Sequence, residues 1–139
     1  MNALDQQPRI VVGLDGSEHS IAALRLAKRI ADALHASVHV VAAWEWPFMW
    51  DPLATPDYIP EREARLAAAA AVDEVFGAGV DLPLDVVQGS PAKALIDASM
   101  GAEMLVVGSR GHGGFAGLLL GSVSAACAEH AHCPVLVVH

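Results

Sequence analysis

The sequence is poor in cysteine, in aromatic residues and in basic residues. Its 139 residues include two cysteines, 5% aromatic residues, and eight lysine and arginine residues against sixteen aspartate and glutamate residues, giving a formal net charge of −8. Two cysteines are too few for a disulfide scaffold. The excess of carboxylates argues against nucleic acid or an anionic membrane surface as a partner. A bound nucleotide is compatible with this charge, because backbone N–H groups can hold phosphates without basic side chains.

Long hydrophobic runs and an apolar leader are also missing. The apolar stretches are far shorter than the roughly 20 residues that a membrane-spanning helix requires, and Met1–Pro8 has no apolar segment typical of a secretory signal. We therefore expect a soluble, cytoplasmic protein. The chain is 54% hydrophobic, which is too apolar for intrinsic disorder. Its length predicts a single domain over residues 1–139.

Short β-branched runs alternate with helical patterns along the chain. The runs that predict strands are Arg9–Leu14, Ser37–Ala43, Leu82–Gln88, Met104–Gly108 and Pro134–Val138. Most of them are continuously apolar, which is typical of strands covered on both faces of a parallel sheet. The segments that predict helices are Glu18–His35, Glu61–Phe76, Ala92–Met100 and Gly121–Ala131. This alternation predicts a doubly wound, Rossmann-like α/β fold, with an open five-stranded parallel sheet and helices on both faces.

Local signals place several boundaries of these elements. Ser17 is a candidate N-cap for the first helix, and Ser90-Pro91 reads as an N-cap followed by proline at the first helical position. The linker Trp44–Pro60 holds four prolines and all three tryptophans, so it is neither a continuous helix nor a central strand. We expect it to lie at the carboxyl edge of the sheet, where its tryptophans cover the hydrophobic edge.

The segment most informative about function is Gly108–Ser124, which follows the fourth predicted strand. In open α/β sheets, ligands bind beyond the carboxyl ends of the strands. This segment has five glycines after Gly108, which favour positive φ and a close approach of backbone amides to a ligand. Free N–H groups of the following helix, the hydroxyls of Ser122 and Ser124, and the Arg110 guanidinium add hydrogen-bond donors. The combination predicts an anion site suited to a polyphosphate, although a surface turn could have the same composition.

Asp15 is a second candidate because it follows the first strand in the turn Gly13-Leu-Asp-Gly16. A turn aspartate or a helix cap is the alternative for this residue. Other motifs fail. A Walker lysine is absent from Gly108–Ser124, which we call the glycine segment. Gly111–Ala116 matches the dinucleotide-binding pattern G-x-G-x-x-A, but that pattern belongs after the first strand and this match follows the fourth, so we regard it as chance. No G-x-S-x-G elbow exists.

Metal binding and acid–base catalysis have little support in the sequence. The spacing of Cys127, His130, His132 and Cys133 fits no zinc pattern, so we expect Cys127 to be buried and the histidines to face solvent. The carboxylates of the second helix fall on its polar face, which predicts a solvated surface. The sequence therefore predicts no metal ligand and no catalytic residue.

The glycine segment resembles a known signature. Gly108-x2-Gly111-x9-Gly121-Ser122 is similar to the nucleotide-binding pattern G-x2-G-x9-G-[ST] of the universal stress protein family. The segments Ile10–Ser20, Met104–Gly111 and Cys133–Val138 also resemble the corresponding segments of that family, in the same order. The resemblance spans nearly the whole chain, and it implies the family's fold, which is similar to that of the adenine nucleotide alpha hydrolases.

The resemblance also implies a ligand and a set of contacts. Members that keep the signature bind ATP, which we expect here together with Mg²⁺. Asp15 would accept a hydrogen bond from the adenine or ribose side, and Ala43 would pack against adenine, where the family usually has valine. The remaining residues implied around the nucleotide are Gly13, Leu14, Val107, Gly108, Arg110, Gly111, Gly121, Ser122, Val123 and Ser124. Family members commonly dimerise through the last strand, here Pro134–Val138.

Together these features predict an ATP-binding, homodimeric regulator or sensor of stress with slow or no hydrolysis, since no base is placed to activate water. Two alternatives stay open. One is a nucleotide-free interaction module that binds partners through Trp44–Pro60. The other is a true ATPase.

Overall fold

The computed structural model describes residues 7–49, 51, 53, 57–111 and 120–139. Some predicted features lie outside this part of the chain. They are residues 1–6 of the N-terminal segment, Trp50 of the linker, the glycines Gly113, Gly114 and Gly117, and the part of the G-x-G-x-x-A match that follows Gly111. Within it, helices and strands alternate as β1 Arg9–Gly13, α1 Glu18–Leu34, β2 Ser37–Trp44, α2 Pro60–Phe76, β3 Leu84–Gln88, α3 Pro91–Ala98, β4 Met104–Gly108, α4 Ser122–His130 and β5 Val135–Val138.

All five described strands are parallel and form one sheet in the order β3-β2-β1-β4-β5. The prediction of a doubly wound five-stranded α/β fold is therefore confirmed. The chain builds outward from β1 to β3 and then returns to the other side of β1 for β4 and β5. The strand order reverses between β1 and β4, so their carboxyl ends flank the crevice in which this class of sheet binds ligands.

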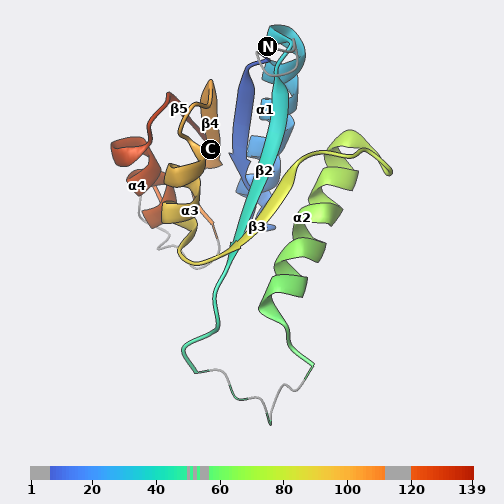
Figure 1. The fold of residues 1–139 in the computed structure, drawn as a ribbon, viewed down its shortest axis with the longest axis vertical. Coiled ribbons are helices and arrows are strands. Elements are labelled where there is room, and N and C mark those ends of the chain that lie inside the picture. Colours follow the sequence, from blue (N-terminus) through green and yellow to red (C-terminus); the bar gives the residue numbers. More distant parts are fainter. Residues whose placement is uncertain (1–6, 50, 52, 54–56, 112–119) are drawn as a thin grey trace.

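Helices cover both faces of the sheet (Figure 1). On one face, Ile10 and Val12 of β1 pack with buried residues of α1 and α2. On the other face, Val11 of β1 packs with Leu95 of α3 and Cys127 of α4. Successive strand residues point to opposite faces, so the central residues of β1 and β4, Ile10–Val12 and Leu105–Val107, are all apolar and buried. This explains why their sequences show no polar alternation.

The predicted helix starts are confirmed at two positions. The Ser17 hydroxyl accepts the Ser20 N–H at 3.2 Å at the start of α1. The Ser90 hydroxyl accepts the Lys93 N–H at 3.3 Å, and Pro91 opens α3. At its other end α1 is one residue shorter than predicted, because His35 takes the left-handed conformation with φ 55° and ends the helix.

The boundary predicted between β2 and the linker was wrong. Trp44 belongs to β2, where it pairs with Gln88 of β3, and its carbonyl accepts the Gly89 N–H at 2.9 Å. β3 begins at Leu84 and β5 at Val135, each slightly later than predicted. Among the described residues, no helix combines the length and the apolar character needed to cross a lipid bilayer.

Candidate functional site

A pocket of about 330 Å³ lies at the carboxyl ends of β1, β2 and β4, beside the first turns of α3 and α4. This volume is at the lower end of the range of small-ligand sites, roughly 300–1,000 Å³. All twelve residues that the sequence assigned to a nucleotide site line this pocket; they are Gly13, Leu14, Asp15, Ala43, Val107, Gly108, Arg110, Gly111, Gly121, Ser122, Val123 and Ser124. The fold thus brings together residues from four separate segments of the chain.

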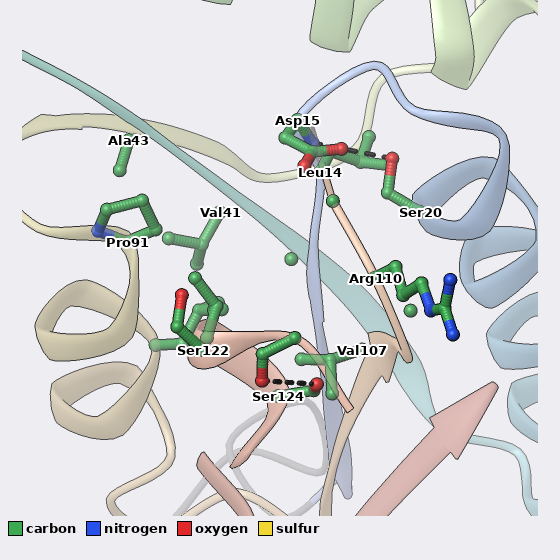
Figure 2. A pocket seen from close by; sticks show the side chains of 16 residues that line it. Leu14, Asp15, Ser20, Val41, Ala43, Pro91, Val107, Arg110, Ser122 and Ser124 are labelled. Atoms are coloured by element: carbon green, nitrogen blue, oxygen red, sulfur yellow. Dashed lines mark hydrogen bonds between the residues drawn. The ribbon is translucent and has the colours of Figure 1, made fainter. Parts of the chain in front are cut away.

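The charged side chains of the pocket lie apart from three of its apolar ones. In Figure 2, Val41, Ala43 and Pro91 gather on one side, whereas Asp15 and Arg110 lie across from them. Asp15 and Arg110 are the charged side chains among the described lining residues, and their charges are opposite. Such a pocket suits a ligand with a flat apolar part and an anionic part.

Asp15 serves the turn after β1 as well as lining the pocket. Its Oδ1 accepts the Ser17 N–H at 2.9 Å, and Gly16 between them has φ 83°, which glycine adopts without strain. The alternative of a turn aspartate is therefore correct for one carboxylate oxygen. The turn also fixes Asp15 at the mouth of the strand, on the side of the pocket that Gly111 lines.

The start of α4 supplies hydrogen-bond donors. Its N-cap is Gly121, which has no side chain to satisfy the first-turn N–H groups, and the first helical acceptor bond comes only at Ala125, whose N–H donates to the Gly121 carbonyl at 3.0 Å. The N–H groups of Ser122, Val123 and Ser124 have no acceptor within the helix. They carry the positive end of the helix dipole and border the pocket.

One of the two predicted hydroxyl donors is used inside the protein. Ser124 is buried, and its hydroxyl donates to the Ser109 carbonyl at 2.9 Å, with the Gly121 carbonyl at 3.1 Å. A hydroxyl has one proton, so Ser124 donates to these carbonyls and not to a ligand. Ser122 is exposed at the first helical position, where its hydroxyl faces the pocket (Figure 2).

The prediction that the signature glycines supply positive φ was wrong for those that the structure describes. The described glycines with positive φ are elsewhere, and Gly108, Gly111 and Gly121 are not among them. These three are close to neighbouring groups instead. A Cβ on Gly108 would lie 2.7 Å from the His19 carbonyl carbon, and a Cβ on Gly121 would lie 3.3 Å from the Ser109 carbonyl oxygen. A Cβ on Gly111 would contact Oδ2 of Asp15.

Four further residues line the pocket that were not among the predicted nucleotide contacts: Ser20, Val41, Pro91 and Leu95. Val41 lies two residues before Ala43 on the same face of β2, so the strand period could have identified it. Ser20 lies three residues after Ser17, which is a helix-start pattern. Pro91 follows β3 at the carboxyl edge, where the alternation of strands and helices places it, whereas nothing in the sequence marked Leu95, because its place depends on α3 packing beside the crevice.

The cysteine and histidine residues near the C-terminus lie outside the pocket. Cys127 is fully buried, and burial raises the pKa of its thiol to about 11, with the Cys133 thiol as a second cause. His130 and His132 are exposed, as predicted. In the described part of the chain, no three histidine, cysteine or acidic side chains come together as a metal site. Trp44 and Trp46 pack edge to face at 5.9 Å between ring centroids, and neither lines the pocket.

The chain is similar to known proteins in sequence and in fold. The sequence model of the universal stress protein family matches residues 8–139. The chain is 39% identical over 140 residues to a universal stress protein of Mycolicibacterium smegmatis, covering 94% of this chain and 47% of that protein. It is 36% identical to a universal stress protein of Thermus aquaticus, covering 93% of this chain and 96% of that one. The chain spans about half the length of the first curated relatives that it matches.

Solved structures agree with the fold. The universal stress protein UspA from Lactobacillus plantarum superposes with a TM-score of 0.74 at 22% identity, covering 95% of this chain and 97% of that chain. A universal stress protein crystallised in complex with cAMP superposes with a TM-score of 0.61 at 35% identity, covering 95% of this chain and 96% of that one.

Proposed function

This chain belongs to the universal stress protein family, and on that premise we propose that it binds an adenine nucleotide, ATP with Mg²⁺, in the pocket between β1 and β4. The observation that carries the proposal is that all twelve residues matched to the family's nucleotide site line one pocket at the point where the strand order reverses. The related protein crystallised with cAMP supports an adenine nucleotide as the ligand class.

The chemistry of the pocket suits such a ligand. The apolar side chains of Val41, Ala43 and Pro91 would pack against the base. The first-turn N–H groups of α4, the Ser122 hydroxyl and the Arg110 guanidinium would hold the phosphates. The positive charge of Arg110 and the positive end of the α4 dipole matter because the whole chain carries a net charge of −8.

Binding of Mg²⁺ would depend mainly on ligands that the nucleotide supplies. Asp15 has the one carboxylate among the described lining residues, and its Oδ1 already accepts the Ser17 N–H. A magnesium ion commonly binds to phosphate oxygens, waters and only one or two carboxylates. The residues present therefore fit an ion that arrives with the triphosphate, held by phosphate oxygens and water near Asp15.

Hydrolysis in this pocket would be slow or absent. A general base must lie within reach of the attacking water. Among the described lining residues, none carries an imidazole, and the single carboxylate belongs to the turn after β1. A phosphate-release assay with Mg²⁺ tests this point, and turnover at an ordinary enzymatic rate would favour the ATPase alternative.

The nucleotide proposal is tested by calorimetric titration of the purified protein with ATP, AMP and cAMP, with and without Mg²⁺. We expect binding that weakens at least tenfold in Arg110→Ala, because a charge-assisted contact to phosphate is lost. Arg29→Ala is the matched control, since Arg29 is an exposed arginine on α1 away from the pocket. Absence of binding to the parent protein, or equal weakening in both variants, would contradict the proposal.

We also propose that the protein is a cytoplasmic homodimer that pairs through β5 and acts as a stress-linked regulator. β5 lies at one edge of the sheet, next to β4, and its four residues are half-buried. An apolar edge strand of this kind favours pairing with a second copy. We expect sedimentation velocity to show a dimer, which Val137→Lys on β5 dissociates. Val87→Lys on the opposite edge strand, β3, should leave the dimer intact, and a monomeric parent would refute the dimer.

A second candidate function is the nucleotide-free interaction module, and one observation favours it. Phe48, Met49 and Leu53, which follow β2, are 100%, 85% and 92% exposed. Large apolar side chains exposed on one short segment commonly mark contact surfaces. The same titration separates the two functions, because an interaction module would bind none of the nucleotides.

A further inference from the structure

Ser20 is a pocket residue whose hydroxyl makes two hydrogen bonds to the backbone. It lies in the first turn of α1, is 5% exposed, and borders the pocket beside Asp15 (Figure 2). Its hydroxyl accepts the Asp15 N–H at 3.4 Å and donates to the Ser17 carbonyl at 2.9 Å. One side chain of the helix therefore connects to the backbone of the turn at two places.

This arrangement departs from the usual start of a helix. In a capping box, the third helical residue accepts a hydrogen bond from the N–H of the N-cap. Here the N-cap is Ser17, and its N–H donates instead to Oδ1 of Asp15 at 2.9 Å. The hydroxyl of Ser20, the third helical residue, reaches two residues further back, to the N–H of Asp15.

Two neighbours therefore hold Asp15 at two different atoms. Ser20 holds its backbone nitrogen, and Ser17 holds Oδ1 of its side chain. Oδ2 lies on the side of Gly111, where a Cβ on that glycine would touch it. Both hydrogen bonds restrict the turn that carries the carboxylate, and removal of either one gives that turn more conformational freedom.

We propose that Ser20 is a positioning residue of the nucleotide site, which fixes the Asp15 backbone so that the carboxylate is oriented before the ligand arrives. The inference rests on the proposed nucleotide function and adds to it a residue outside the family signature. Orientation before binding raises affinity because the turn then loses little conformational entropy when the ligand binds. Ser20 itself need not touch the ligand.

The test compares Ser20→Ala with the parent by calorimetric titration with ATP, well below the melting temperature. We expect affinity to fall about fivefold, the effect of one neutral hydrogen bond. Ser20→Thr keeps the hydroxyl and should recover most of that loss. Hydrogen exchange of the Asp15 amide gives a separate readout, since exchange should be faster in Ser20→Ala and slow in the parent and in Ser20→Thr.

Ser99 offers a matched control. It is a fully buried serine whose hydroxyl donates to the Ile96 carbonyl at 2.6 Å and accepts the His132 N–H at 2.9 Å. These bonds have the same pattern as those of Ser20, but Ser99 does not line the pocket. We expect Ser99→Ala to lower the melting temperature and to leave the affinity for ATP unchanged.

The outcomes separate the two ideas. If the parent binds ATP and Ser20→Ala binds it equally well, the positioning role is wrong and the nucleotide function stands. Equal weakening in Ser20→Ala and Ser99→Ala also overturns the positioning role, because the effect then follows stability. If the parent binds no ATP, both ideas fail together. Should Ser20→Ala be too unstable to purify, Ser20→Cys, with its weakly hydrogen-bonding thiol, replaces it with the same expected result.

Discussion

A methyl group added at Gly108 should destabilise the protein far more than one added at Gly13. The two glycines end the neighbouring strands β4 and β1, and a Cβ would meet another atom at 2.7 Å and 2.8 Å respectively. At Gly108 the atoms are the backbone carbonyl carbon and Cβ of His19 in the first turn of α1. At Gly13 the nearest atom is Cδ1 of Leu95, the flexible end of a side chain.

The expected magnitudes follow from what each neighbour can do. A methyl forced into a packed site costs about 1–3 kcal/mol. We expect the upper end, about 3 kcal/mol, in Gly108→Ala, because α1 would have to move as a unit, and about 1 kcal/mol or less in Gly13→Ala, because Leu95 can rotate. Loss of glycine also reduces the entropy of the unfolded chain by a similar amount in both variants, so the difference between them isolates the clash.

Differential scanning calorimetry measures this difference directly. For a chain of this length, 1 kcal/mol corresponds to roughly 3–4 °C in melting temperature. Gly108→Ala should therefore melt about 6–10 °C below Gly13→Ala. Equal melting temperatures would refute the argument that the glycine at 108 is required by the close approach of the α1 backbone.

Three further predictions concern other parts of the molecule. Gly111→Ala should weaken ATP binding about tenfold in calorimetry, because its methyl group meets Oδ2 of Asp15 and displaces that carboxylate from its position in the pocket. The melting temperature should fall by only a few degrees, because the carboxylate can rotate away. Unchanged affinity would contradict this prediction. Ser17→Ala should lose about 1 kcal/mol of unfolding free energy in urea titration through loss of the α1 N-cap, and a loss near zero would show that the cap contributes nothing. Burial raises the pKa of Cys127 to about 11, so the thiol of the unfolded chain ionises first as the pH rises above about 9. The free energy of unfolding should therefore fall by about 1–2 kcal/mol between about pH 9 and about pH 10.5. Cys127→Ala should remove this part of the pH dependence, and an identical pH slope in the variant would refute the assignment.

The architecture could be predicted from sequence because local and global signals agree. The uninterrupted apolar runs of β1 and β4 predict central strands, and Ser17 and Ser90 predict helix starts that the structure confirms. The end of β2 could not be predicted in this way. Trp44 is followed by a proline-rich segment, and it extends the strand only because β3 pairs with it.

The site could be predicted as a set of residues but not in its physical reasons. Glycine spacing identified Gly108, but the structural reason for a glycine at this position is His19. His19 lies far away in sequence, and its backbone leaves no room for a Cβ on residue 108 in the folded chain. Leu95 escaped prediction because an apolar residue on a short helix reads as ordinary core. Contacts between distant segments decide both cases, and a single sequence carries no record of them.

The peptide of Ser109 gives the signature a fixed beginning and end. Its N–H donates to the Val138 carbonyl at 2.7 Å, and its carbonyl accepts the Gly121 N–H at 2.6 Å. The segment that starts after Ser109 therefore returns to this residue at Gly121, and the hydrogen bond to Val138 of β5 holds Ser109 in place. Gly121, which begins the helix at the pocket, is thus held by a backbone hydrogen bond to Ser109 that no side chain provides, so its position does not depend on the side chain at residue 109.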